Sequence, residues 1–145
     1  MAASSDGNNE CDGKNERNFL QMHRLLAASA RVLRAKFESK VPTFPKWPPS
    51  VKDLKKAKLS EKQIQHMKQH PGSDNYDISL LISLLRHFCY KADLKNALWE
   101  ETDNDKIIPS QTQEIADIVR IRNLRNKVCI LLIYFCYLLD VCKCV

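Results

Sequence analysis

Four cationic or amide side chains stand close together at the point where a polar segment becomes wholly apolar. The group consists of Arg120, Arg122, Arg125 and Asn126. A guanidinium can stabilise developing phosphate charge, and it can also hold a phosphate of a nucleic acid. The same residue types are common on a solvated helix surface. The group therefore has three interpretations: an active-site arginine, a nucleic-acid contact, or ordinary helix surface.

The positions of these residues around the expected helix differ. Its apolar stripe consists of Ile118, Ile121, Val128, Leu132, Phe135 and Leu139. Arg125 fills the one gap in this stripe, whereas Arg120 and Arg122 largely leave it. Because an unpaired buried charge is costly, we predict that Arg125 is a structural cation at a helix seam. Asp117 or Asp77 is its expected carboxylate partner.

The end of the same helix is apolar on every side. Residues 128–139 carry no charge, and a small bundle cannot cover all faces of such a helix. We expect the leftover surface to meet another chain, through Val128, Leu132, Phe135 and Leu139. Twelve apolar residues suit a core helix or dimer face better than a membrane span, and membrane contact remains the second interpretation. A poorly folding artefact is the third.

A basic patch precedes the second half of the chain. Its lysines include Lys52, Lys55, Lys56 and Lys58. Together with Arg120 and Arg122 they are candidate nucleic-acid contacts, and Phe44 and Trp47 lie nearby to stack on bases. No nucleic-acid recognition motif accompanies them, so a solvated face is favoured. The net charge of +6 is compatible with weak, non-specific RNA binding.

The histidines and cysteines give little support for catalysis or metal binding. His66 and His70 are one turn apart, but no third ligand is marked. His87 and Cys89 are two residues apart and would face different ways on a helix. The chain has six cysteines and no C-x-x-C, and it lacks a signal-peptide pattern at its start. We therefore expect reduced, buried thiols, no metal, no cofactor and a cytoplasmic protein.

Helical periodicity dominates the chain. With 145 residues, 44% of them hydrophobic, and only 3 glycines, the composition supports one domain and argues against a turn-rich β protein. The first expected helix spans 18–40, with an inner stripe of Phe19, Met22, Leu26, Ser29, Leu33 and Phe37. The last runs from about Gln113 to Leu139. We predict an all-α bundle of four or five helices over 18–139, with a disordered tail at 1–17 and a short tail at 140–145.

Capping patterns mark several helix starts. Ser60 with Gln63, and Ser110 with Gln113, have the spacing of a capping box. Asp74 or Asp77 is expected to begin the central helix, whose almost continuous apolar surface predicts deep burial.

The order of these segments resembles the HEPN domain (higher-eukaryote and prokaryote nucleotide-binding). The similarity is to the subfamily of the DAZ-interacting zinc-finger ubiquitin ligase and many animal immune-type proteins. It covers about Asn18 to Val128. It is carried by "FLQMHRLLAASARVLRAKFESKVP", then "YDISLLISLLRHFC", then Trp99, a Pro-Ser opening and "ADIVRIRNLRNKV". The final "CILLIYFCYLLDVCKCV" does not resemble the family's continuation, and we interpret it as a truncated or alternative end.

The resemblance has consequences for catalysis. HEPN proteins that cut RNA use an arginine, a polar residue directly after it, and a histidine about one and a half turns later. Arg125 and Asn126 match the first two positions, but the histidine should fall near Ile130 or Leu131, and neither is one. The resemblance thus implies a non-catalytic interaction or assembly module. Its expected partners are a second copy or another HEPN or helical protein, in the context of larger ubiquitin-ligase or immune-type proteins. The alternatives are an RNA-binding or ribonuclease HEPN protein and, third, a membrane-attached helical protein.

Overall fold

The computed structural model describes residues 6–41, 47–108 and 114–143, with side chains described between 13 and 133. Its α-helices are α1 Asp6–Lys40, α2 Val51–Lys56, α3 Glu61–Gln69, α4 Ile78–Leu84 and α5 Glu114–Lys143. A π-helical turn, η3 Leu85–Cys89, continues α4. Four 3-10 turns complete the set: η2 Ser73–Asn75, η4 Lys91–Asp93, η5 Ala97–Glu100 and η6 Asn104–Lys106. No strand occurs in these described ranges, and the predicted all-α bundle is confirmed.

Local capping chemistry sets the ends of the short helices. The predicted capping box of α3 is present: Ser60 Oγ accepts from the backbone N–H of Gln63, and Gln63 Oε1 accepts from the N–H of Ser60. At α4, Asp77 rather than Asp74 is the N-cap, with Oδ1 2.8 Å from the backbone N of Leu80. Residues 109–113, with the predicted cap at Ser110, lie outside the described part of the chain.

The core surrounds α4. Leu81, Leu84 and Leu85 are completely buried, as expected from the nearly continuous apolar sequence. Trp99, from the η5 turn, is 1% exposed and donates its indole N–H to the Asp93 carbonyl at 3.0 Å. Trp99 is therefore one of the contacts that hold the polar connection between α4 and α5 against the bundle.

Helix α1 begins at Asp6, so the prediction of a disordered tail is wrong for residues 6–17. No proline interrupts the chain from Asp6 to Lys40, and the helix continues outward from its packed half. Leu33 and Phe37 are buried as predicted, whereas Phe19 and Met22 are 38% and 36% exposed. The inner stripe of α1 therefore extends further along the sequence than the bundle that covers it.

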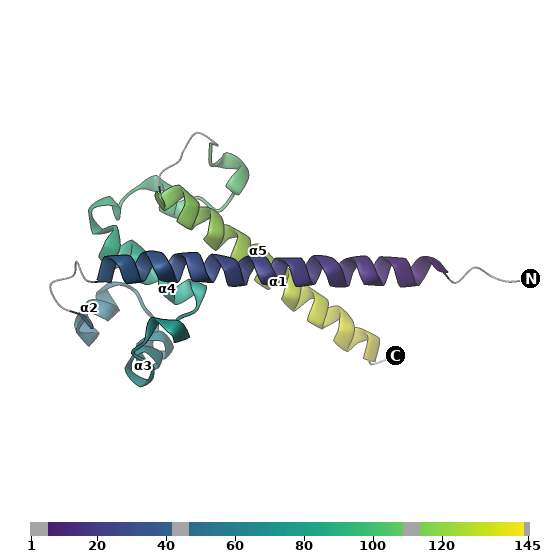
Figure 1. Ribbon diagram of the computed structural model, residues 1–145, viewed down its shortest axis with the longest axis horizontal. Coiled ribbons are helices and arrows are strands. Elements are labelled where there is room, and N and C mark those ends of the chain that lie inside the picture. Colours follow the sequence, from purple (N-terminus) through teal and green to yellow (C-terminus); the bar gives the residue numbers. More distant parts are fainter. Residues whose placement is uncertain (1–5, 42–46, 109–113, 144–145) are drawn as a thin grey trace, which may run out of the picture.

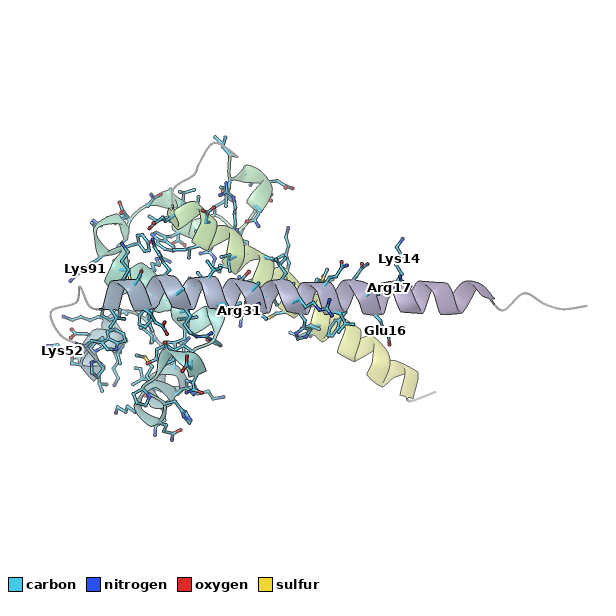
Figure 2. The ribbon with its side chains drawn as sticks, in the orientation of Figure 1. Lys14, Glu16, Arg17, Arg31, Lys52 and Lys91 are labelled. Carbon is cyan, nitrogen blue, oxygen red and sulfur yellow. The ribbon has the colours of Figure 1, made fainter. Side chains whose placement is uncertain are left out.

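Helices α1 and α5 cross, and each continues past the rest of the bundle (Figure 1). We call the two projecting parts the arms: residues 14–25 of α1 and residues 129–143 of α5. In Figure 2, Lys14, Glu16 and Arg17 lie on the α1 arm, while Lys52 and Lys91 lie at the opposite end of the molecule. Helix α5 ends at Lys143 rather than Leu139, so residues 140–143 belong to the helix and not to a separate tail.

Candidate anion-binding cleft

A cleft of about 320 Å³ lies where α4, η3 and α5 meet the end of α2. Its cationic lining residues are Lys58, Arg86, Arg122 and Arg125. Asn126, His87 and the hydroxyl-bearing Ser79 and Ser83 also line it, and none of its described lining residues is Asp or Glu. Four cations line the cleft and one of them, Arg86, pairs with Glu100 beside it, so the remaining positive charge favours an anion.

Arg122 lines the cleft, and its guanidinium donates hydrogen bonds to backbone carbonyls of the protein itself. Its Nη1 donates to the carbonyl of Trp99, and its Nη2 donates to the carbonyl of Glu101 at 2.7 Å. Burial lowers the pKa of this guanidinium, although an arginine stays protonated at neutral pH. Arg122, which the sequence register placed largely off the stripe, is therefore the arginine that joins α5 to the η5 turn.

Asn123 is a structural residue that the sequence analysis missed. It is 3% exposed, and its Nδ2 donates to the Glu101 carbonyl and to Oδ1 of Asn104, both at 3.0 Å. The signal was present in the sequence, since Ala116, Val119 and Asn123 follow a three-then-four spacing, and all three are buried. Ile118 and Val128 of the predicted stripe are buried as well, so the buried surface of α5 is wider than predicted and includes the side that carries Asn123.

Arg125 is not a buried seam cation, and the predicted pairing is wrong. Within the described residues its recorded bond is from Nη1 to Oδ1 of Asn126 at 3.2 Å. Asp117 instead pairs with Arg120 at 2.8 Å, and Asp77 caps α4. Arg125 is half-exposed and faces the cleft together with Asn126. The two residues that match the family's motif are therefore available to a ligand.

Arg86, from η3, also lines the cleft. Its Nη2 lies 2.7 Å from Oε1 of Glu100, and its guanidinium carbon lies 5.3 Å from the centre of the Trp99 ring. The hydrogen bond from Arg86 lowers the pKa of the Glu100 carboxyl. The Nε atom of Arg86 is buried without a hydrogen-bond partner among the described residues. Glu100 fixes the orientation of Arg86 while leaving this N–H donor unused.

His87 lines the same cleft. Burial, and then the charges of Arg86 and Lys58, lower the pKa of its imidazole below the usual 6.5. His87 is therefore neutral at pH 7 and adds no fifth charge there. Two residues later, burial raises the pKa of the Cys89 thiol to about 11, which excludes a reactive thiolate at neutral pH.

The predicted basic residues are divided between several places. Lys58, which has a left-handed backbone φ of 59°, lines the cleft, and Lys56 lines a neighbouring hollow. Lys52 and Lys55 are exposed on α2. Arg120 is directed elsewhere, since it donates to Asp117 and to the Ile108 carbonyl. Only part of the predicted nucleic-acid surface is thus assembled around the cleft.

The hollow has a volume of about 600 Å³ and shares Ala57 and His87 with the cleft. Trp47 and Phe88 line it, with ring centres 6.2 Å apart and planes at 88°. Trp47 also packs edge-on against Phe37 at 5.2 Å, which anchors it to the core. Phe44, the other predicted stacking residue, lies outside the described part of the chain.

The predicted association residues of α5 have different environments. Val128 is 3% exposed and buried within the chain, so its side chain is not part of an open surface. Leu132 is half-buried, and the side chains of Phe135 and Leu139 are not among those described. Among the described side chains of this helix, the exposed large apolar ones are instead Ile130, Leu131 and Ile133, at 67%, 52% and 71%.

The remaining candidates have simple environments. His66 Nε2 lies 2.8 Å from the Asn75 carbonyl, and its ring centre lies 5.1 Å from that of His70. Among the described residues, no three His, Cys, Asp or Glu side chains gather as a metal site. Within that same part of the chain, no helix combines the length and hydropathy that crossing a membrane requires.

The chain was compared with known protein families, with curated proteins and with solved structures. A family model described as DZIP3/hRUL138-like HEPN matches residues 27–131. Neither the curated proteins nor the solved structures gave a match. The family match covers α2, α3, α4 and both faces of the cleft, including Arg125 and Asn126. Since it spans most of the 145 residues, the chain belongs to the DZIP3/hRUL138-like HEPN family.

Proposed function

We propose that this HEPN domain is a non-catalytic assembly module that associates with a second copy of itself through its arms. The observation that carries the proposal is the exposed apolar surface of the α5 arm. Ile130 and Ile133 are one turn apart and are 67% and 71% exposed. Burying such a side chain stabilises a complex by about 1.5–3 kcal/mol, so a patch of this kind is rarely left in water.

The chemistry of the arm favours a second copy as the partner. Residues 128–139 contain no charged side chain, so this surface offers no ionic complementarity to a different protein. A two-fold interface needs only one self-complementary patch, and it is the commonest arrangement of homo-oligomers. The α1 arm adds two further exposed apolar side chains, Leu20 and Leu25, at 54% and 50% exposure.

The absence of catalysis is supported by the residues after Arg125. Where RNA-cutting relatives carry a histidine, this chain has Ile130 and Leu131, which cannot exchange a proton. Both are more than half exposed on the α5 arm. The position that would serve acid–base chemistry has therefore become part of the proposed association surface.

The test is the mass of charged variants in solution. Ile130→Glu combined with Ile133→Glu should convert the associated protein to a monomer, because two carboxylates would be buried at the interface. Ile108→Glu is the matched control, since Ile108 is 57% exposed and lies outside both arms. Light scattering gives the mass, and far-ultraviolet circular dichroism verifies that each variant is folded. An unchanged mass for the folded double variant would rule out this surface.

A second candidate function is binding of RNA phosphates in the cleft without cleavage. It is favoured by one observation, that four cations and no carboxylate line the cleft at Arg125 and Asn126. Arg125→Gln should weaken binding of a short single-stranded RNA and reduce its salt dependence by about one charge. Arg31→Gln is the control, because Arg31 is exposed on α1 (Figure 2) and is not among the residues that line the cleft. Fluorescence anisotropy over a salt series measures both, and equal loss in the two variants would argue against a defined site.

A further inference from the structure

We infer that α1 carries a docking surface for an acidic amphipathic helix of another protein. This surface lies mainly on the packed half of α1, whereas the proposed self-association centres on the α5 arm. It combines an apolar stripe at heptad spacing with a row of arginines along one edge of that stripe. The inference therefore goes beyond self-association and gives the domain a second, heterotypic partner.

The apolar stripe of α1 lies on a different side of the helix from the residues that face the core. Its members are spaced by three, four and three residues, as the a and d positions of a heptad are: Leu25, Ala28, Val32 and Ala35. Leu33 and Phe37, which are buried in the core, do not belong to it. Leu25 is 50% exposed, and Val32, which lies outside both arms, is 63% exposed. The two alanines would let the backbone of a partner helix approach closely.

The arginine row follows one edge of this stripe. Arg17, Arg24 and Arg31 are seven residues apart, which places them at the g positions of the same heptad, about 10 Å apart along the helix axis. Arg17 and Arg31 mark its two ends on α1 (Figure 2). All three are exposed, and no carboxylate of the described segments pairs with any of them. Because side chains at this heptad position form ion pairs across a helix pair, the row favours carboxylates on the facing helix.

Other charged side chains near the stripe leave this preference in place. Glu38 continues the arginine row by one heptad, and its carboxylate accepts a hydrogen bond from a serine of η2. Lys36, on the opposite edge of the stripe, pairs with Glu114 of α5. Glu16 is exposed beside the first arginine, and the exposed Lys14 offsets its charge. The stripe therefore presents a net positive charge to a partner.

A second copy of α1 does not fit this stripe. In a parallel pair of α1 helices, Arg24 and Arg31 would meet the positions of Ser29 and Lys36, which supply no carboxylate. In an antiparallel pair the two arginine rows would face each other. Like charges brought together in this way disfavour a complex, whereas a helix with carboxylates at the facing positions removes the repulsion.

An anionic lipid surface fits the stripe less well than an acidic helix does. Helices that lie in a membrane interface bury a broad apolar face that carries Trp, Phe or Leu. The stripe has only two large apolar side chains, Leu25 and Val32, and two alanines between and beyond them. This narrow surface matches the seam of a helix pair.

Two synthetic peptides test the inference. Each has about four heptads with leucine at the a and d positions, and the e and g positions carry glutamate in one peptide and lysine in the other. Like charges keep each peptide from pairing with itself, so a gain of helical circular dichroism on mixing reports binding. In fluorescence anisotropy, the acidic peptide should bind the domain at least about tenfold more tightly than the basic one. Equal affinities for the two peptides would overturn the inference.

Reversing the charge of the row should reverse the choice of peptide. Arg24→Glu combined with Arg31→Glu should bind the basic peptide more tightly than the acidic one. Lys52→Glu combined with Lys55→Glu is the matched control, since both lysines are exposed on α2 and the net charge changes equally. The control should keep its preference for the acidic peptide. Reversal in both double variants would reduce the effect to overall charge and contradict a defined surface.

The apolar stripe is tested separately. Val32→Glu should weaken the acidic peptide by at least about tenfold, because it places a carboxylate in the seam. Ile108→Glu, which introduces the same charge at an exposed position outside α1, should leave the affinity unchanged. Thermal melts verify that each variant is folded. A folded Val32→Glu variant with undiminished affinity would show that the peptide binds elsewhere.

Two further measurements separate this inference from its alternatives. The Ile130→Glu, Ile133→Glu variant should still bind the acidic peptide, whether or not it loses self-association, and loss of the peptide there would place the contact on the α5 arm instead. Vesicles of phosphatidylcholine with phosphatidylserine are the lipid probe. Vesicle binding that requires Arg24 and Arg31, in a protein that does not bind the acidic peptide, would assign the stripe to a membrane and overturn the inference.

Discussion

Nη2 of Arg122 lies 2.7 Å from the carbonyl oxygen of Glu101, a residue 21 positions earlier in the chain. With the second bond to the Trp99 carbonyl, this contact joins α5 to the η5 turn and holds Trp99 in the core. Arg125, three residues later, makes no comparable contact among the described residues and faces the cleft. The two arginines thus have different roles despite their similar surroundings in sequence.

Replacing the two arginines should separate these roles. Arg122→Ala leaves the carbonyls of Trp99 and Glu101 without their donor, and we expect it to lower the free energy of unfolding by about 2–3 kcal/mol. Arg125→Ala should lower it by less than about 1 kcal/mol, as a surface substitution does. Urea unfolding followed by tryptophan fluorescence measures both. A larger loss for Arg125→Ala than for Arg122→Ala would contradict the assignment.

Glu114 should make the free energy of unfolding depend on pH. Its carboxylate accepts from Lys36 Nζ and from Tyr90 Oη, and these bonds lower its pKa below the ordinary 4.5. The stabilisation is therefore present above pH 4.5 and is lost as the pH falls through the lower pKa of the folded state. Because the Glu114 side chain is 55% exposed, its contribution should be at most about 1 kcal/mol.

The matched variant is Glu114→Gln. At pH 7 it should be slightly less stable than the unmodified protein, and the two should converge as the pH falls through the lowered pKa of folded Glu114. Urea unfolding at several pH values between 3 and 7 gives the difference in free energy directly. A difference that stayed constant over this range would mean that the charge of Glu114 does not contribute.

The thiol of Cys89 should react slowly with alkylating reagents in the native protein. Burial raises its pKa from 9.0 to about 11, so at pH 8 its thiolate fraction is lower by about a hundredfold than that of an unperturbed thiol. Iodoacetamide labelling of the native protein, followed by peptide mass spectrometry, should find Cys89 modified correspondingly slowly, with full modification after unfolding in urea. Labelling of native Cys89 at the rate of a free thiol would show that the site opens readily.

The protein should not cleave RNA. The motif position near Ile130 and Leu131 lacks a histidine, and within the described residues no hydrogen bond orients the His87 imidazole toward Arg125. Labelled single-stranded RNA should therefore stay intact in the presence of a chelator. Cleavage that disappears in both His87→Ala and Arg125→Ala would contradict a non-catalytic role, because His87 would then supply the missing acid–base group.

Much of the fold could be predicted because its signals are local. The capping box at Ser60 and the N-cap at Asp77 depend on residues three positions away, and both are present. The deep burial of α4 followed from its sequence, which is apolar on nearly every face. The bundle class and the family resemblance followed from the order of such segments, and both are confirmed.

The candidate site was harder to predict because its geometry depends on distant segments. Arg122 finds its acceptors only because the η5 turn places the carbonyls of Trp99 and Glu101 beside it, and the spacing along α5 indicates no more than the side of the helix that is buried. The apolar periodicity also placed Val128 on an open face and did not identify Ile130 as exposed. The cleft is lined by Lys58, Arg86 and Arg125, which come from three separate segments, so no single sequence motif could predict it.

The most direct test of the central proposal, self-association through the arms, is sedimentation of the unmodified 145-residue chain in buffer without detergent over a wide range of concentrations. We predict a reversible equilibrium in which the mass doubles as the concentration rises, since the exposed surface of Ile130 and Ile133 needs a second copy to cover it. A well-folded protein that sediments as a monomer of 16.8 kDa at every concentration would contradict the proposal.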